Sequence, residues 1–265
     1  MTILEEIKMD LGIKNKKVLV CGGTKGIGRA VADEFAKEGS LIHIIARHDS
    51  SKVAKEISQK YDVKVFGHDG DLSKFDDVKR ISSEVGDVDV LFINAGGPKP
   101  GDMEDLTDED WHTAYDLTMM SAVRLINSFL PGMLSKKWGR IIASTSVSVY
   151  EPIPRLLLSN SIRMAVIGLM RSLSAEHAKD GVTFNCIAPG YTLTERIKIL
   201  FNDTAQKKHI TFEEASKDIV EKTDIKRLAK PEEIASTVVF LASDRAAYIT
   251  GTTIRIDGGY VASTL

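Results

Sequence analysis

Short apolar runs alternate along this chain with segments in which apolar side chains recur every three or four positions. The first run, residues 18–21, is long enough for a buried strand and too short for a helix. Similar runs predict strands at 41–46, 63–67, 88–93, 139–146, 182–187 and 252–256. Helical patterns predict helices at 26–39, about 51–60, between 67 and 88, at 107–134 and 155–179, and from Pro231 onward. Thr107 and Asp110 form a capping-box-like start for the helix at 107–134. Such alternation is typical of an α/β domain built on a parallel sheet.

A glycine-rich turn joins the first predicted strand to the first predicted helix, with the spacing Gly22-x-x-x-Gly26-x-Gly28. Free N–H groups and the positive end of the helix dipole point at the same spot there, which makes an anion site. Glycine allows the backbone to approach a pyrophosphate closely. The pattern therefore predicts a dinucleotide site in a Rossmann-like, doubly wound α/β fold, with a seven-stranded parallel sheet and helices on both faces. An ordinary tight turn is the alternative.

The end of the second predicted strand bears on the choice of nucleotide. An NAD site places an acidic residue there, to bind the ribose 2′-hydroxyl. This chain has Arg47 instead, and Lys25 lies within the glycine turn. Two cations suit a 2′-phosphate, so NADP(H) is favoured. Asp49 lies close by and keeps NAD(H) as the alternative, and two solvated basic residues are the non-functional interpretation.

Composition narrows the class of protein. The net charge is −2 with no long run of one sign, so the chain has no electrostatic footprint for nucleic acid. No apolar run reaches the roughly 18 residues of a membrane span, and the N-terminus lacks a signal-peptide core. Cys21 and Cys186 lie in predicted strands. We therefore expect buried free thiols, a cytoplasmic protein, and one domain over 16–265 after an N-terminal extension, 1–15, that forms a short amphipathic helix.

Four motifs occur in order: the glycine turn, Asn94-Ala95-Gly96, Pro189-Gly190 and Asp257-Gly258-Gly259. Together they resemble the short-chain dehydrogenase/reductase family. The resemblance implies that an Asp at position 71 binds adenine, that Leu72 flanks it, and that 191–226 is a substrate lid. The cofactor-binding residues it implies are Gly22, Thr24, Lys25, Gly26, Ile27, Gly28, Arg47, Asp71, Leu72, Asn94, Ala95, Gly96, Arg163, Pro189, Gly190, Thr192 and Thr194.

The catalytic signature departs from that family. Its Ser is present as Ser146, but Ser159 stands at the Tyr position, Arg163 at the Lys position and Thr118 at the Asn position. In these replacements the chain resembles a 3-oxoacyl-reductase-like subgroup with a degenerate catalytic tetrad. A serine hydroxyl is a far weaker acid than a phenol, and a charged arginine does not relay protons as lysine does. The usual proton donor is thus missing from its place.

Two tyrosines are candidates for that role. Tyr150 follows Ser146 by four residues, and Tyr191 follows Pro189-Gly190 directly. Either could bring a phenol to the substrate oxygen, with Ser146 as a second donor. An aromatic wall of the substrate pocket is the alternative for both.

These motifs and their departures from the family pattern leave three candidate functions. The first is an NADP(H)-dependent oxidoreductase that interconverts a small carbonyl compound and its alcohol, with a non-standard proton donor. The second is a catalytically inactive NADP(H)-binding sensor or scaffold, and the third is non-redox chemistry such as a dehydration. We expect no metal. Surplus apolar residues in the helix 159–178, with Val261 and Leu265 in the tail, predict a homodimer or homotetramer.

Overall fold

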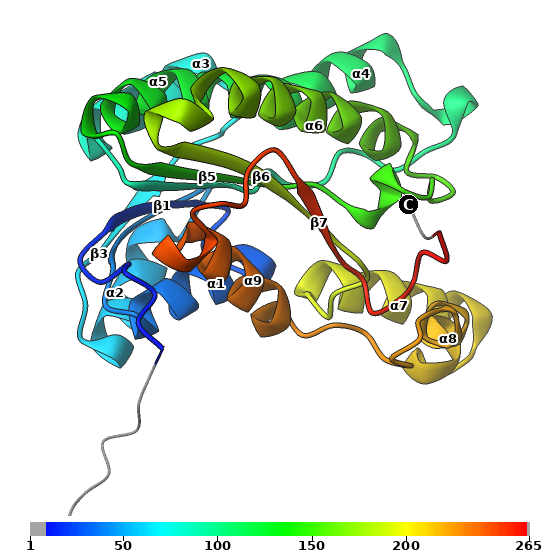
Figure 1. Ribbon diagram of the computed structural model, residues 1–265. Helices are drawn as coiled ribbons and strands as arrows, with labels where there is room; N and C mark the ends of the chain where they lie inside the picture. Colours follow the sequence, from blue (N-terminus) through cyan, green and yellow to red (C-terminus); the bar gives the residue numbers. More distant parts are fainter. Residues whose placement is uncertain (1–8, 264–265) are drawn as a thin grey trace, which may run out of the picture.

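The computed structural model describes residues 9–263, which form one seven-stranded parallel sheet in the order β3-β2-β1-β4-β5-β6-β7 (Figure 1). The strands are β1 Lys17–Cys21, β2 Leu41–Ala46, β3 Val65–Asp69, β4 Val90–Ile93, β5 Gly139–Ser144, β6 Val182–Pro189 and β7 Thr253–Ile256. The helices are α1 Gly26–Lys37, α2 Ser50–Tyr61, α3 Phe75–Val85, α4 Asp108–Tyr115, α5 Ser121–Lys136, α6 Leu157–His177, α7 Glu195–Lys208, α8 Phe212–Lys222 and α9 Pro231–Ala242. The predicted fold class is confirmed.

Helices cover both faces of the sheet. In Figure 1, α1, α2 and α9 lie below it, whereas α3, α5 and α6 lie above it. One apolar core is accordingly shared by α1, α2, α9 and the sheet, and a second by α3, α5, α6 and the sheet. Because the central strands are covered on both sides, every residue of β4 and β6 is buried. This burial explains why β4 and β1 after Lys17 are continuous apolar runs rather than alternating ones.

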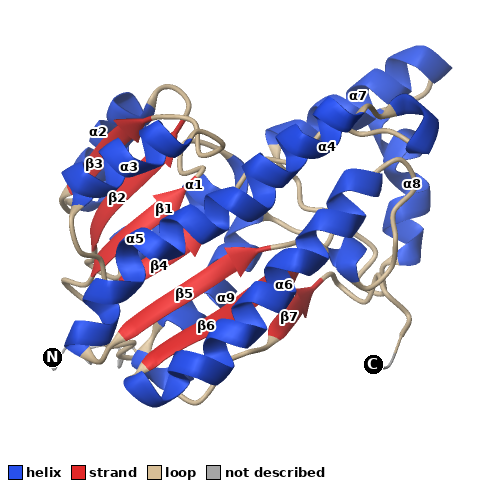
Figure 2. Cartoon of the chain, turned by 90° about the horizontal axis from the view of Figure 1, so that it is seen from above, coloured by secondary structure: helices blue, strands red, loops and turns tan. Residues whose placement is uncertain are grey.

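The order of the strands reverses at β1, which pairs with β2 on one side and with β4 on the other. In an open α/β sheet, ligands bind outside the carboxyl ends of the strands at such a switch point. Figure 2 shows α7 and α8 beyond the carboxyl ends of β5, β6 and β7. The fold therefore predicts a site at this edge, bordered by α7.

The long helix predicted at 107–134 is interrupted by one π-helical turn, Asp116–Met120, between α4 and α5. The capping box of Thr107 and Asp110 forms as expected. The stretch Asp108–Lys136 is long and apolar enough to cross a membrane by length and composition, with a mean hydropathy of 1.2 over its best window. Its apolar residues instead include Leu125, Phe129 and Met133, which belong to the core.

Two segments differ from expectation. Residues 1–8 lie outside the described part of the chain, and residues 9–15 contain no helix, although Ile13 is buried in the core with 1% exposure. The third strand is displaced to Val65–Asp69. A Cβ at Gly67 would lie 2.2 Å from the backbone of Ser50, so α2 packs directly on this strand. Cys21 and Cys186 are both buried free cysteines, as expected.

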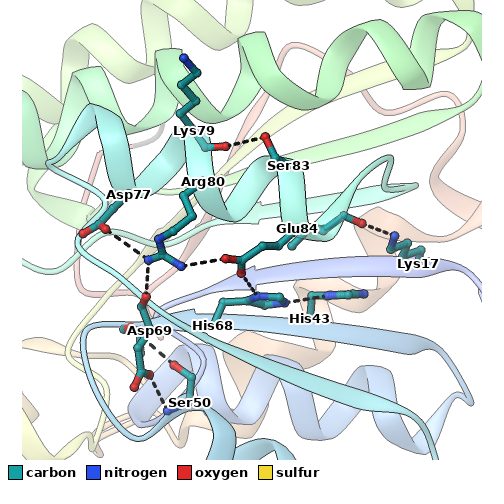
Figure 3. A network of polar contacts seen from close by, with 12 residues as sticks. Lys17, His43, Ser50, His68, Asp69, Asp77, Lys79, Arg80, Ser83 and Glu84 are labelled. Carbon is teal, nitrogen blue, oxygen red and sulfur yellow. Dashed lines mark hydrogen bonds and ion pairs between the residues drawn. The ribbon is translucent and has the colours of Figure 1, made fainter.

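A polar network ties the carboxyl end of β3 to β2 and α3 (Figure 3). His43 Nδ1 lies 3.0 Å from His68 Nε2, and His68 Nδ1 lies 3.0 Å from Glu84. Arg80 donates to Glu84 at 3.1 Å and to the Asp69 carbonyl at 2.8 Å. The network thereby holds the carboxyl end of β3, from which the predicted adenine-binding residues follow.

Candidate active site

A cavity of about 1290 Å³ lies along the carboxyl ends of the strands. Its walls come from the segments that follow β1 to β6 and from the first turns of α7. The predicted cofactor residues that line it are Gly22, Thr24, Lys25, Ile27, Arg47, Asp71, Leu72, Asn94, Ala95, Gly96, Arg163, Pro189, Gly190, Thr192 and Thr194. Residues scattered over the whole sequence thus meet at one edge of the sheet. Gly26 and Gly28 do not line the cavity but shape the turn beside it.

The glycine turn has the geometry of an anion site. Gly22 and Gly26 adopt φ values of +65° and +57°, which suit glycine. A Cβ at Gly28 would lie 2.1 Å from the Gly22 carbonyl oxygen, so a side chain there would push the turn apart. Lys25 precedes α1 and makes no side-chain cap hydrogen bond. The first N–H groups of α1 therefore remain available to a phosphate.

The segment after β4 leaves space for a ligand. Asn94 donates from Nδ2 to the Cys21 carbonyl at 3.3 Å, which ties the end of β4 to the end of β1. Gly96 lines the cavity, and a Cβ there would meet nothing within 4 Å. A methyl group at position 96 would begin to fill this space, which lines the same cavity as the uncapped N-terminus of α1. The space fits a bound dinucleotide.

Unpaired basic side chains mark the nucleotide end of the cavity. Lys25 and Arg47 both line it, and neither forms an ion pair within residues 9–263. Asp49 also lines the wall, with a left-handed backbone at φ 64°. Asp71 uses Oδ1 to accept hydrogen bonds from the N–H and hydroxyl of Ser73, at 2.9 and 2.8 Å. These two bonds fix the carboxyl group at the wall of the cavity.

The predicted catalytic residues Ser146, Ser159 and Arg163 meet at the other end of the cavity. Arg163 is 7% exposed; its Nε donates to Ser159 Oγ at 3.1 Å, and its Nη1 donates to the Ser144 carbonyl at 2.9 Å. Ser146 Oγ accepts from the N–H of Ser148 at 3.1 Å. Because both serine oxygens act as acceptors in these bonds, both hydroxyl hydrogens are free to bind a ligand.

The guanidinium of Arg163 has no carboxylate partner among the described residues. Burial, and then the neighbouring charge of Arg196, lower the pKa of Arg163 to about 10. Arginine remains protonated at neutral pH with this value, but its positive charge is poorly compensated. The site therefore favours a ligand or transition state that carries negative charge.

Tyr150 lies away from the cavity, in disagreement with its predicted role. Its hydroxyl donates to the Thr253 carbonyl at 2.8 Å, and it does not line the cavity. The short 3-10 turn Val147–Val149 begins at the cavity wall with Val147, and the Tyr150 side chain that follows it is directed to β7. Sequence spacing from Ser146 does not reveal the direction of such a turn.

Tyr191 does line the cavity. Its ring packs against Tyr260 with centroids 5.4 Å apart, and burial, followed by Tyr260, raises the pKa of Tyr191 to about 12. A phenol of that pKa is a weaker acid than an exposed tyrosine. The aromatic-wall interpretation describes this placement better than the proton-donor interpretation does.

Thr118 is buried in the π-helical turn and does not reach the cavity wall, which is formed there by Thr113 and Leu117. Its Oγ1 is one of the buried side-chain oxygens without a hydrogen-bond partner in the described structure.

The predicted lid segment, 191–226, contains α7, but none of the α7 residues that form the cavity wall was singled out from the sequence. Arg196, Ile197 and Leu200 of this helix line the cavity. A Cβ at Gly97 would lie 1.8 Å from Arg196 Nη1, so the guanidinium rests directly on the glycine. The signal was Thr194, which begins α7 as its N-cap and places the first turn of the helix beside the predicted cofactor residues. Among residues 9–263, no cluster of His, Cys, Asp or Glu could hold a metal ion.

Comparison with known proteins agrees with this geometry. A family model described as enoyl-(acyl carrier protein) reductase matches residues 22–261. The uncharacterized oxidoreductase YvrD of Bacillus subtilis is 36% identical, over 96% of this chain and 100% of that protein. The 3-oxoacyl-[acyl-carrier-protein] reductase FabG of Staphylococcus epidermidis is 32% identical, over 92% of this chain and 98% of its own length.

A solved structure shares the whole architecture. The L-sorbose reductase of Gluconobacter frateurii, complexed with NADPH and L-sorbose, superposes with a TM-score of 0.93. It is 31% identical, and the match covers 96% of this chain and 100% of that one. With a family model over most of its length and relatives matched nearly end to end, this chain belongs to the short-chain dehydrogenase/reductase family.

Proposed function

We propose that this protein is an NADP(H)-dependent oxidoreductase that interconverts a carbonyl compound and its alcohol. One observation carries the proposal: a single cavity is lined by the glycine turn, Lys25 and Arg47, and also by Ser146 and the hydrogen-bonded pair Ser159–Arg163. The NADPH complex of the sorbose reductase, which has the same fold, supports the choice of cofactor.

The first N–H groups of α1 would hold the pyrophosphate, and Lys25 and Arg47 would bind the 2′-phosphate. Asn94 and Gly96 would border the middle of the cofactor, and Arg163 would bind the nicotinamide ribose. When bound, NADPH supplies a hydride to the substrate carbon.

The protein's own part in catalysis is to stabilise the oxygen of the reacting carbonyl. Ser146 and Ser159 have free hydroxyl hydrogens at the cavity wall, and both would donate to this oxygen as negative charge develops on it. The proton then passes from Ser159 Oγ to the product oxygen, and solvent restores it. Serine and the product are both aliphatic alcohols, so this transfer is close to thermoneutral.

Arg163 assists that transfer without giving up its own proton. Its guanidinium donates to Ser159 Oγ at 3.1 Å and stabilises negative charge on either oxygen during the exchange. This role replaces the predicted tyrosine donor: the hydroxyl of Tyr150 is bound at Thr253, and the pKa of Tyr191 is raised to about 12.

The second candidate function is an NADP(H) sensor that does not turn over. The absence of a phenol from the Arg163–Ser159 pair favours it, because the acid of the family's mechanism is then missing. An outward face of α6 that exposes Met164, Ala165 and Gly168 supports a homo-oligomer in either case.

Fluorescence titration of the full chain with NADPH and NADH tests the proposed cofactor. We expect NADPH to bind at least about tenfold more tightly, a difference of roughly 1.4 kcal/mol. Arg47→Met should remove most of that preference, whereas Lys55→Met, an exposed change on α2 outside the cavity, should retain it. Equal binding of the two nucleotides would overturn the 2′-phosphate site, and no binding of either would overturn both candidate functions.

A further inference from the structure

A second pair of cations occupies the substrate end of the cavity. Arg196, in the first turn of α7, lines the wall and makes no hydrogen bond or ion pair within residues 9–263. Its guanidinium rests on Gly97, where a Cβ would lie 1.8 Å from Nη1. The absence of a side chain at 97 therefore makes room for the planar head of Arg196.

The charges around Arg196 are not compensated by the protein. Arg163, which lines the same cavity and is 7% exposed, has its pKa lowered by burial first and by the charge of Arg196 second. Two like charges have thus been brought together next to a cavity. Such an arrangement destabilises the empty site and is offset by an anionic ligand.

The acidic residues of the cavity lie elsewhere. Asp49, Glu56 and Asp71 line it, and all three come from segments after β2 and β3, at the nucleotide end. Two other cations of the substrate end are already neutralised: Lys99 pairs with Asp110 at 2.7 Å, and Arg155 pairs with Asp102 at 3.1 Å. Arg163 already donates to Ser159 and to the Ser144 carbonyl, so Arg196 is the cavity cation left for a substrate at this end of the described structure.

We propose that the substrate is an oxo acid whose carboxylate is bound by Arg196, with its carbonyl at Ser146 and Ser159; this substrate class rests on the proposed carbonyl reduction. A guanidinium matches a carboxylate with two parallel hydrogen bonds. Only one unpaired guanidinium comes from α7, which suits a singly charged carboxylate better than a doubly charged phosphate. Apolar side chains that line the same cavity would receive the carbon chain of the acid: Ile153, Leu156, Ile197 and Leu200.

The inference is tested by pairs of probes that differ only in charge. Acetoacetate, levulinate and ketoisocaproate are each compared with their methyl ester, and dihydroxyacetone phosphate is compared with dihydroxyacetone. Binding to the NADP⁺-saturated protein is measured by calorimetry, because an oxo compound and the oxidised cofactor do not react. Turnover is measured separately as NADPH oxidation.

We expect at least one oxo acid to bind about 10- to 100-fold more tightly than its ester, the range typical of charge-assisted hydrogen bonds. Arg196→Met should remove that difference between acid and ester. Lys198→Met, which removes an exposed charge from the same helix outside the cavity, should retain it.

The outcomes separate the substrate class from the proposed function. Oxo-acid binding that depends on Arg196, without NADPH oxidation, would retain the carboxylate site and refute the reductase. Turnover of esters and acids with equal efficiency would retain the reductase and refute the carboxylate site. The carboxylate site would also be refuted if the phosphorylated ketone bound more tightly than the oxo acids, or if no oxo acid bound. It would be refuted as well if Arg196→Met lost as much affinity for NADPH as for the oxo acid, because Arg196 would then belong to the cofactor site.

Discussion

Two glycine-to-alanine substitutions separate the packing of the nucleotide turn from the space left for the nucleotide. At Gly28, the new Cβ would lie 2.1 Å from the Gly22 carbonyl oxygen and 2.7 Å from its carbon. At Gly96, the same methyl group would meet nothing within 4 Å. The first change therefore strains the protein itself, whereas the second only fills space beside the proposed cofactor.

The structure gives the expected magnitudes. Overpacking costs about 1–3 kcal/mol, and a backbone contact as short as that at Gly28 belongs at the upper end. Alanine regains about 1 kcal/mol in a helix, so Gly28→Ala should lower the free energy of unfolding by about 2 kcal/mol. Gly96→Ala should raise it by about 0.4–1 kcal/mol, because alanine restricts the unfolded chain. Its methyl group should nevertheless weaken NADPH binding at least about tenfold.

Urea unfolding without nucleotide measures the stability of both variants, and NADPH fluorescence measures binding. Wild-type NADPH affinity in Gly96→Ala would refute the placement of the cofactor against the segment after β4. Undiminished stability of Gly28→Ala would refute the close contact within the turn.

Three further predictions concern polar groups. Arg163→Met should lower kcat by about 10²-fold or more, and Arg163→Lys should lower it less because the charge is kept; equal rates for all three proteins would exclude the guanidinium from catalysis. Burial first, and then the charges of Lys17 and His68, lower the pKa of His43 from 6.5 to about 4. Between these two pH values the unfolded chain binds a proton at His43 that the folded chain does not bind. The free energy of unfolding should therefore fall by about 2 kcal/mol between about pH 7 and about pH 5, and level off below about pH 4. His43→Leu should lack this pH-dependent loss. Parallel pH profiles of the wild-type protein and His43→Leu in urea unfolding would contradict the prediction. Thr118→Val should raise the free energy of unfolding by about 1 kcal/mol, because it removes a buried oxygen without a partner; a lower value would show that Oγ1 is bonded, for example to a water.

The sequence specified the features that depend on local chemistry. The glycine spacing predicted the turn because only glycine tolerates both the backbone at Gly22 and the contact at Gly28. The Thr107–Asp110 capping box marked the start of α4 because a cap is formed within one turn. Cofactor residues far apart in the chain could be grouped because parallel strands bring their carboxyl ends to one edge.

Features that depend on three-dimensional direction escaped prediction. The turn after Ser146 sends Tyr150 to the Thr253 carbonyl, and no residue spacing shows this. The π-helical turn at 116–120 has the same apolar pattern as a regular helix. The sequence does not show that Arg196 lies over Gly97, because this contact depends on where α7 is placed. The lowered pKa of Arg163 likewise depends on its burial and then on the charge of Arg196, and both follow only from the packing of the helices.

The most direct test of the account is NADPH oxidation by the purified full chain with a panel of carbonyl substrates, alongside Ser159→Ala. The account predicts carbonyl-dependent turnover in the wild-type protein. It also predicts a loss of about 10²-fold or more in Ser159→Ala, the size expected for an oxyanion donor, with NADPH affinity nearly unchanged. Tight NADPH binding without turnover of any carbonyl compound, or full activity in Ser159→Ala, would contradict it.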